Sequence, residues 1–143
     1  MKEVLKPIII FSVFQHDKDS FDNLDAHNKL KDKLKAKHIK FVETMGQYKG
    51  TKELSLVLDA SYIDKIKFVL AFYNQESYLY LDQDRNATLV YNDKIESIGV
   101  FREVPEAYDG DYTQNVNGGP KFSVIDNSVT IEYDVFKQLE FTK

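Results

Sequence analysis

Two short segments concentrate side chains that can bind or transform a small molecule. The first is Gly46–Ser55, in which Tyr48 lies between two glycines and Glu53 opens an apolar stretch. The second is Gln75-Glu76-Ser77, where an acid lies between an amide and a hydroxyl. Turns explain the glycines, but a tyrosine and two carboxylates where strands begin are typical of ligand sites. Either acid alone is an ordinary strand-end carboxylate; together they are the candidate catalytic residues.

The histidines do not form a recognisable metal site. His16, His27 and His38 show neither a His-x-x-His nor a His-Glu-x-x-His spacing, so the sequence predicts no metal. His27 falls on the apolar face of an expected helix. This position favours a buried or subunit-interface histidine over a catalytic base.

Asp82-x-Asp84-x-Asn86 resembles the start of a calcium-binding loop. However, Ala87 stands where such a loop needs glycine, and Asp93 stands where a bidentate glutamate is usual. A hairpin turn between two strands is the better interpretation.

Composition limits the classes of protein that fit. The chain has 143 residues, 43% of them hydrophobic, so it can form one domain (residues 1–143) with a substantial core. The net charge is −4, and the lysine-rich stretch 29–37 is interleaved with leucine and aspartate as on a solvated helix face. Nothing therefore indicates binding to nucleic acid.

The sequence also indicates the cellular location of the protein. The absence of cysteine excludes disulfides and thiol catalysis. No apolar run approaches membrane-spanning length, and the N-terminus is typical of a strand rather than a signal peptide. We expect no membrane partner and a cytoplasmic location.

Hydrophobic periodicity predicts strands and two helices. The first helix spans 20–37, and the second begins with a capping box at Ser61 and buries a face from Tyr62 to Tyr73. Phe68 and Phe72 lie on its opposite face and suggest a second packing surface, such as another subunit. The expected strands span 4–14, 38–45, 54–59, 77–81, 87–92 and 95–104.

The order of these elements is β-α-β-β-α-β followed by extra C-terminal strands. This order predicts an α+β fold, the ferredoxin-like split βαβ sandwich. The acidic, glycine-rich stretch Glu106–Pro120 is predicted to be a long loop, and Phe122–Tyr133 a terminal hairpin with Asp126-Asn127 at its turn.

Several motifs occur in the same order in a known enzyme family. They are Phe11-Ser12-Val13-Phe14, Gly46-Gln47-Tyr48-Lys49, Gln75-Glu76-Ser77-Tyr78-Leu79, Leu89-Val90-Tyr91 and Phe101-Arg102-Glu103-Val104-Pro105. Over roughly residues 8–125 the chain resembles the phage-encoded S-adenosylmethionine lyases, long called S-adenosylmethionine hydrolases. The resemblance implies a ferredoxin-like subunit, a homotrimer with active sites between subunits, and cleavage of S-adenosylmethionine to 5′-methylthioadenosine and homoserine lactone. It also implies an anti-restriction role.

The implied reaction fits the candidate residues. The substrate's own carboxylate attacks its γ-carbon and expels a neutral thioether, so the enzyme needs neither a cofactor nor a nucleophile of its own, only to hold the methionine arm folded. A carboxylate against the sulfonium would stabilise the ground state and slow the reaction. We therefore expect Glu76, with Glu53 close by, to bind the ammonium group. Glu76→Gln should abolish turnover with little loss of folding.

The remaining candidates would bind the rest of the substrate. Gln75 and Ser77 offer hydrogen bonds to the ribose, the adenine or the arm, and Tyr48 offers a ring to the adenine or the cation. Backbone groups of Ser12, Val13 and Phe14 would complete the pocket.

Two other outcomes stay open from the sequence. Either acid could activate water and give homoserine. Alternatively, the chain is a non-catalytic ferredoxin-like trimer that binds an adenine nucleotide or a host protein through the 106–120 stretch.

Overall fold

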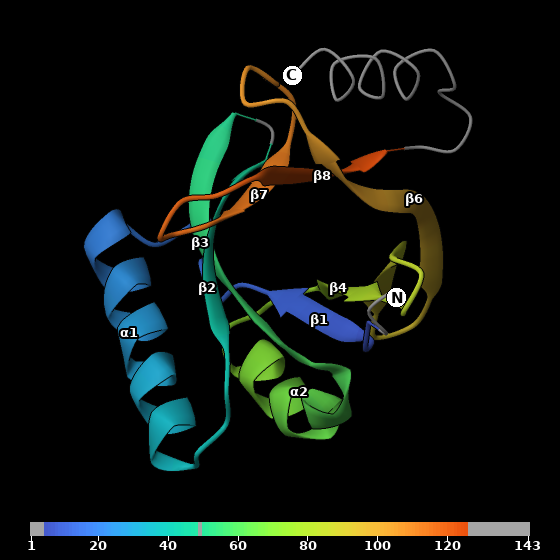
Figure 1. Cartoon of the computed structure of the whole chain (residues 1–143). Helices are drawn as coiled ribbons and strands as arrows, with labels where there is room; N and C mark the ends of the chain where they lie inside the picture. Colours follow the sequence, from blue (N-terminus) through green and yellow to red (C-terminus); the bar gives the residue numbers. More distant parts are fainter. Residues whose placement is uncertain (1–4, 49, 126–143) are drawn as a thin grey trace.

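The computed structural model describes residues 5–48 and 50–125, with the side chain of Tyr48 excepted (Figure 1). Its elements follow one another as β1 (Ile8–Phe11), α1 (Ser20–Ala36), β2 (Val42–Tyr48), β3 (Thr51–Asp59), the 3₁₀ turn η1 (Ala60–Tyr62), α2 (Ile63–Phe72), β4 (Ser77–Leu81), β5 (Asn86–Tyr91), β6 (Ile95–Val104), β7 (Tyr112–Asn115) and β8 (Lys121–Ile125).

All the strands belong to one closed antiparallel barrel, in the order β1-β3-β2-β7-β8-β6-β5-β4. Closure comes from the pairing of β1 with β4 on one side and of β2 with β7 on the other. Figure 1 shows both helices on the outside of this barrel, α1 alongside β2 and β3 and α2 beneath β1.

The prediction of a ferredoxin-like sandwich is therefore wrong. Apart from the turn η1, the elements from β1 to β4 do follow the predicted β-α-β-β-α-β order, but their sheet does not stay open. β5 and β6 continue it beyond β4, while β7 and β8 bridge from β2 to β6 and close the wall. A closed sheet has no free edges, which removes the unpaired backbone groups that an open sheet exposes.

Alternation along the strands creates two apolar layers. In β1, Ile9 and Phe11 face outward into a core shared with the helices, which also contains Leu56 and Leu58 of β3. Ile10 faces inward and packs with residues such as Leu81 inside the barrel. Successive side chains point to opposite faces of a strand, so β1, a continuous apolar run, serves both cores.

The first helix was predicted within one residue. The Asp19 side chain caps its N-terminus by accepting a hydrogen bond from the Asp22 N–H at 2.7 Å. Leu30 and Leu34 pack into the outer core. The helix ends where His38 adopts a left-handed conformation (φ 57°) and the Ile39 N–H reaches the Leu34 carbonyl at 2.9 Å.

The second helix has the predicted buried face but not the predicted capping box. The Asp59 side chain caps the preceding turn η1 by accepting from the Ser61 N–H at 2.9 Å, and α2 begins at Ile63 without a side-chain cap. Ile66 is buried, whereas Phe68 and Phe72 are 81% and 77% exposed. The predicted amphipathic pattern of this helix is thus confirmed.

The stretch after β6 is not the predicted long loop. It contains β7, which pairs with both β2 and β8. The predicted terminal hairpin begins correctly near β8, but 126–133 and the proposed turn lie outside the described residues. Among the described residues, no helix is both long and apolar enough to cross a bilayer.

Candidate active site

The inside of the barrel holds a cavity of about 400 Å³, within the size range of roughly 300–1,000 Å³ that is usual for small-molecule sites. Its wall combines serine and threonine hydroxyls, an amide, two carboxylates and several aromatic and aliphatic side chains. The lining residues with polar side chains are Ser12, Glu53, Ser55, Gln75, Ser77, Tyr78, Asp111, Tyr112, Thr113 and Ser123.

Glu53 faces this cavity because of its place in the β2–β3 hairpin. Gly46 pairs with Glu53 on one side and with Thr113 on the other, so these residues form one row across three strands. Glycine contributes no side chain to this row, which leaves the space beside Glu53 free. The prediction that Gly46 ends its strand is wrong, because β2 runs on to Tyr48 and β3 starts at Thr51.

Burial changes the protonation of this acid. Desolvation in the barrel raises the pKa of Glu53 above its ordinary value, while the His16 imidazole and the Ser12 hydroxyl oppose the rise by less. A partly desolvated carboxylate gains more from a bound cation than an exposed one does. Glu53 is therefore suited to bind a positively charged group of a ligand.

Hydrogen bonds fix the backbone that follows β1 at the edge of the cavity. The Ser12 hydroxyl donates to the Leu54 carbonyl at 2.8 Å and accepts from the Phe14 N–H at 3.1 Å. The Gln75 side-chain amide donates to the Phe14 carbonyl at 2.6 Å. Leu54 and Phe14 thus hold the Ser12 hydroxyl in place, and Phe14 holds the Gln75 amide, before any ligand binds.

Helix α1 holds the same segment from the other side. The Asn23 side chain accepts from the Gln15 N–H at 2.8 Å and donates to the Gln15 carbonyl at 3.0 Å. His27, which is 1% exposed, lies edge-to-face with the Phe14 ring. The predicted burial of His27 is confirmed.

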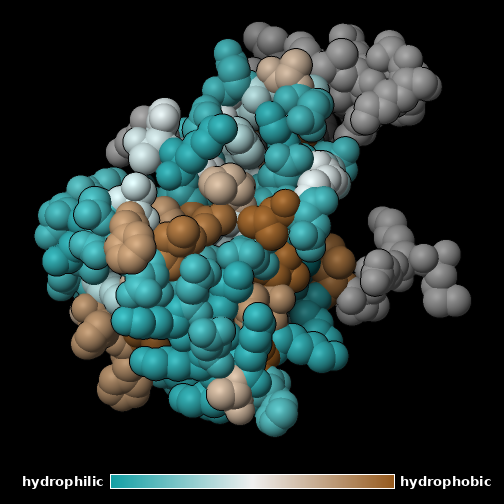
Figure 2. All heavy atoms as spheres, turned by 90° about the vertical axis from the view of Figure 1, so that its left-hand side faces the viewer, coloured by the Kyte–Doolittle hydropathy of each residue, from teal (hydrophilic) through white to brown (hydrophobic). Residues whose placement is uncertain are grey.

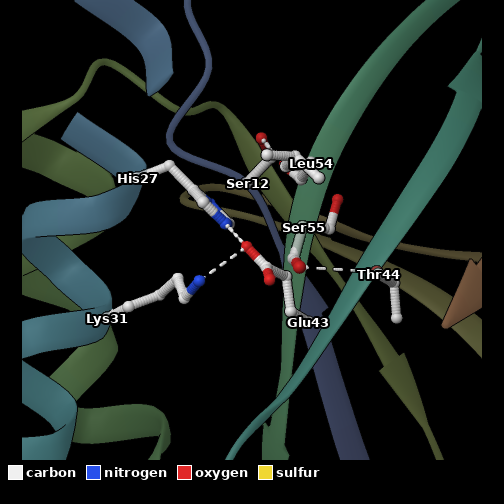
Figure 3. A network of polar contacts seen from close by, with 7 residues as sticks. All are labelled: Ser12, His27, Lys31, Glu43, Thr44, Leu54 and Ser55. Carbon is white, nitrogen blue, oxygen red and sulfur yellow. Dashed lines mark hydrogen bonds and ion pairs between the residues drawn. The ribbon is translucent and has the colours of Figure 1, made fainter. Parts of the chain in front are cut away.

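Figure 3 shows His27 and Lys31 of α1 converging on Glu43 of β2. The His27 Nε2 lies 2.5 Å from one carboxylate oxygen of Glu43, and the Lys31 ammonium lies 3.0 Å from the same oxygen. Burial lowers the pKa of His27, more than the carboxylate raises it. Partial burial alone would raise the pKa of Glu43, but its bonds to His27 and Lys31 outweigh that effect and lower it. A neutral His27 that donates a hydrogen bond to an ionised Glu43 agrees with both pKa shifts.

Sequence comparison assigns the chain to a family. The model of the S-Adenosylmethionine lyase family matches residues 9–125, which include every lining residue of the cavity. The chain belongs to this family. None of the curated proteins compared with the chain matches it. Family membership supports S-adenosylmethionine as the small-molecule substrate and lyase activity at the level of the family.

The structure brings together four of the residues expected to form the site of this lyase-family chain. Ser12, Glu53, Gln75 and Ser77 all line the barrel cavity. Val13 does not, because it is 1% exposed and packs into the outer core between the barrel and the helices. Phe14 approaches the site through its carbonyl bond to Gln75, while its ring packs against His27. The Tyr48 side chain lies outside the described part of the structure.

Glu76 does not line the barrel cavity. It is exposed and borders a separate pocket of about 210 Å³, which Gln75, Ser77 and Tyr78 line as well. Strand alternation explains this, since Gln75 and Ser77 flank it and turn toward the cavity. Within one chain, Glu53 and Glu76 do not line the same cavity.

Several lining residues of this lyase-family site were missed by sequence reasoning. Phe101 and Phe122 stack at 5.3 Å between ring centroids and form part of the cavity wall. Asp111 and Thr113 lie at the start of β7, in a stretch interpreted as a loop. The signal for Phe101 was available, because it opens one of the motifs shared with the family; Asp111 sits in an Asp-Gly-Asp sequence that is typical of turns.

Proposed function

We propose that this protein cleaves S-adenosylmethionine to 5′-methylthioadenosine and homoserine lactone. The observation that carries the proposal is the half-buried, cavity-facing Glu53 in a chain of the S-adenosylmethionine lyase family. The substrate bears an ammonium group, and a partly desolvated carboxylate favours binding of such a cation.

In the proposed reaction, an oxygen of the substrate carboxylate forms a bond to the substrate γ-carbon. The γ-carbon–sulfur bond breaks, and its electron pair stays on sulfur as the neutral thioether of 5′-methylthioadenosine. No proton, metal or cofactor takes part, because nucleophile and leaving group belong to the same molecule. The task of the protein is to hold the two reacting atoms close together.

The wall of the cavity supports this chemistry. Leu79, Leu89 and Ile98 offer the sulfonium poor solvation, and this penalty disappears when sulfur becomes neutral. Glu53 and Glu76 would both accept hydrogen bonds from the substrate ammonium, which has three N–H donors. We assign Gln75, Ser77 and Ser12 to the ribose and the arm, and Tyr48 to the adenine.

The direct test is to incubate the purified protein with S-adenosylmethionine and identify the products by chromatography and mass. We expect 5′-methylthioadenosine and homoserine lactone in equal amounts. Homoserine formed without lactone would replace intramolecular attack by water attack. Saturable binding without product would overturn the enzyme proposal in favour of the non-catalytic binding module.

We propose that active sites form between the subunits of a homotrimer, so that the partner subunit's Glu76 completes the site containing Glu53. The outward position of Glu76 supports this arrangement, since within one chain it lies outside the cavity.

Complementation tests the shared site. We expect Glu53→Gln and Glu76→Gln each to be inactive alone, and their mixture, after dissociation and reassembly, to recover part of the wild-type activity. Recovery arises because a mixed trimer contains sites with both acids intact. The control is the Glu53→Gln variant alone, dissociated and reassembled in the same way. If the mixture of the two variants stays inactive, the proposal of shared sites is contradicted.

The exposed phenylalanines of α2 support an interface for this trimer. Burying Phe68 and Phe72, now largely exposed, would contribute roughly 1.5–3 kcal/mol per side chain. We expect light scattering to give a mass near three times 16.6 kDa, and a smaller mass for Phe68→Ser combined with Phe72→Ser. The matched control is Phe21→Ser, another largely exposed phenylalanine on the other helix. A monomeric wild type would rule out the trimer.

The biological role we propose is anti-restriction in the cytoplasm of a bacterial host, by depletion of the methyl donor that methylases require. The match to the S-adenosylmethionine lyase family supports this role only through the substrate. Plating of phage on restricting hosts that express wild-type or Glu53→Gln protein would test it, with rescue expected only for the wild type.

A further inference from the structure

A second cavity lies where β1 and β2 begin and β3 ends. Its volume is about 900 Å³, and it shares no lining residue with the Glu53 cavity. The charged residues around it are mostly cationic, although the chain as a whole carries a net charge of −4. They are Lys6, Lys35, Lys40 and Arg85, with Asp59 as the one carboxylate of the lining, and His38 adds an imidazole.

Two of these cations are partly compensated, because Asp59 lies near Lys6 and Asp82 lies near Arg85. Lys6, Lys35 and Lys40 form no ion pair with any residue in 5–48 or 50–125. The Asp59 carboxylate already accepts a hydrogen bond from the Ser61 N–H at 2.9 Å. The excess of cations over carboxylates around this concavity creates a positive potential that favours an anionic ligand.

Backbone conformation is a second and independent indication. Three residues other than glycine have positive φ among those described, namely His38, Asn74 and Arg85. Such positions favour glycine or asparagine, yet two of them carry cationic or imidazole side chains that line this same cavity. Residues kept in disfavoured conformations concentrate at functional sites, because the side chain there serves a purpose.

Arg85 is held in place by hydrogen bonds of both its backbone and its side chain. Its carbonyl accepts from the Phe101 N–H at 2.9 Å, and its Nη1 donates to the Lys6 carbonyl at 2.8 Å and the Asp82 carbonyl at 3.1 Å. These contacts fix the guanidinium at the cavity wall before a ligand arrives. Guanidinium groups match the geometry of phosphate oxygens.

The rest of the wall is apolar and partly aromatic, with Ile8, Phe41, Val57 and Tyr62 among its residues. A ligand that fits both parts has several phosphate charges and a planar apolar group. We propose that this cavity binds a nucleoside triphosphate, with its phosphates on Lys35, Lys40 and Arg85 and its base against the aromatic wall. The site is separate from the proposed lyase activity and does not depend on it.

Isothermal titration calorimetry with ATP, tripolyphosphate and adenosine tests the ligand class. We expect ATP to bind with one site per chain, more tightly than tripolyphosphate or adenosine, and less tightly as salt is raised. Equal binding of ATP and tripolyphosphate would overturn the nucleotide assignment. Tighter, site-dependent binding of a short oligonucleotide would overturn it in favour of nucleic acid, and no ATP binding would overturn the site.

Variants locate the binding. Lys35→Glu combined with Lys40→Glu should weaken ATP binding by about tenfold or more, since two attractive charges become repulsive. Lys33→Glu combined with Lys52→Glu changes the net charge equally away from the cavity and should leave binding intact. An equal loss in both double variants would show non-specific attraction and overturn the proposal.

The variant His38→Gly tests ligand binding separately from the stability of the fold. Glycine suits the left-handed position after α1, so the midpoint of thermal unfolding should stay unchanged or rise. ATP binding should nevertheless weaken, because the imidazole leaves the cavity wall. Unchanged binding together with a higher midpoint would mean that His38 does not contact the ligand and would contradict its place in the site.

Discussion

Replacing Glu53 by glutamine should lower the turnover of S-adenosylmethionine by about 100-fold or more while leaving the fold intact. The glutamine side chain keeps the shape of the carboxylate but loses the charge that would hold the substrate ammonium. Product formation measured by chromatography reports the loss. Glu96→Gln on β6, an exposed position outside the cavity lining, is the matched control and should keep the wild-type rate. A Glu53→Gln variant that retains most of the activity would remove this residue from the proposed mechanism.

The same substitution should change stability in a pH-dependent direction. Because the pKa of Glu53 is raised in the fold, the native state binds more protons than the unfolded state at pH values between the ordinary and the raised pKa. Wild-type stability therefore falls as pH rises through this window, and Glu53→Gln removes that fall. Thermal unfolding at several pH values should show that the stability of the variant rises relative to that of the wild type at pH values above this window. A stable but inactive variant would separate the catalytic effect from any loss of folding.

His27→Ala should produce the largest loss of stability, about 2–4 kcal/mol. The substitution empties a site that is 1% exposed, removes the edge-to-face contact with Phe14, and leaves half-buried Glu43 with Lys31 as its partner. For a chain of this size the unfolding midpoint should fall by roughly 5–15 °C. His16→Ala, an exposed histidine, is the control and should change stability by less than about 0.5 kcal/mol.

The pH dependence of this network has a defined sign. The pKa of His27 is lowered by burial, so the unfolded state binds more protons through the ordinary range of histidine. Wild-type stability therefore declines as pH falls through that range. His27→Gln, whose amide can still donate to Glu43, should show a shallower decline. An equal decline in both proteins would place the responsible proton elsewhere.

Local structure was predictable where the signal lies within a few residues. The apolar faces of α1 and α2 follow from helical spacing, and β4 and β6 follow from short apolar stretches between turns. Glu53 was identified because it is the only acid between Tyr48 and Asp59 in a glycine-bounded segment. These inferences depend on neighbours in sequence, which a single chain reveals.

Closure of the barrel was not predictable by the same means. It depends on pairs such as Thr44 with Asn115 and Ile9 with Tyr80, which lie far apart in the chain and leave no periodic signal. The four residues of β7 are polar in part and follow a stretch rich in glycine and aspartate, so their composition is that of a loop. For that reason Asp111 and Thr113 were missed and the sheet was expected to stay open.

The strands that complete the barrel are the last of the described strands to be synthesised. The ribosome releases Ser12, Glu53, Gln75 and Ser77 before any residue of β5 to β8, which supply the opposite wall of the cavity. A nascent chain that ends near Leu81 carries these polar groups on an open sheet with its inner apolar face uncovered. Pairing of the last strands requires contacts between distant segments, which form late in folding. A ribosome that stalls before β8 therefore yields an inactive, aggregation-prone fragment and no partially active enzyme.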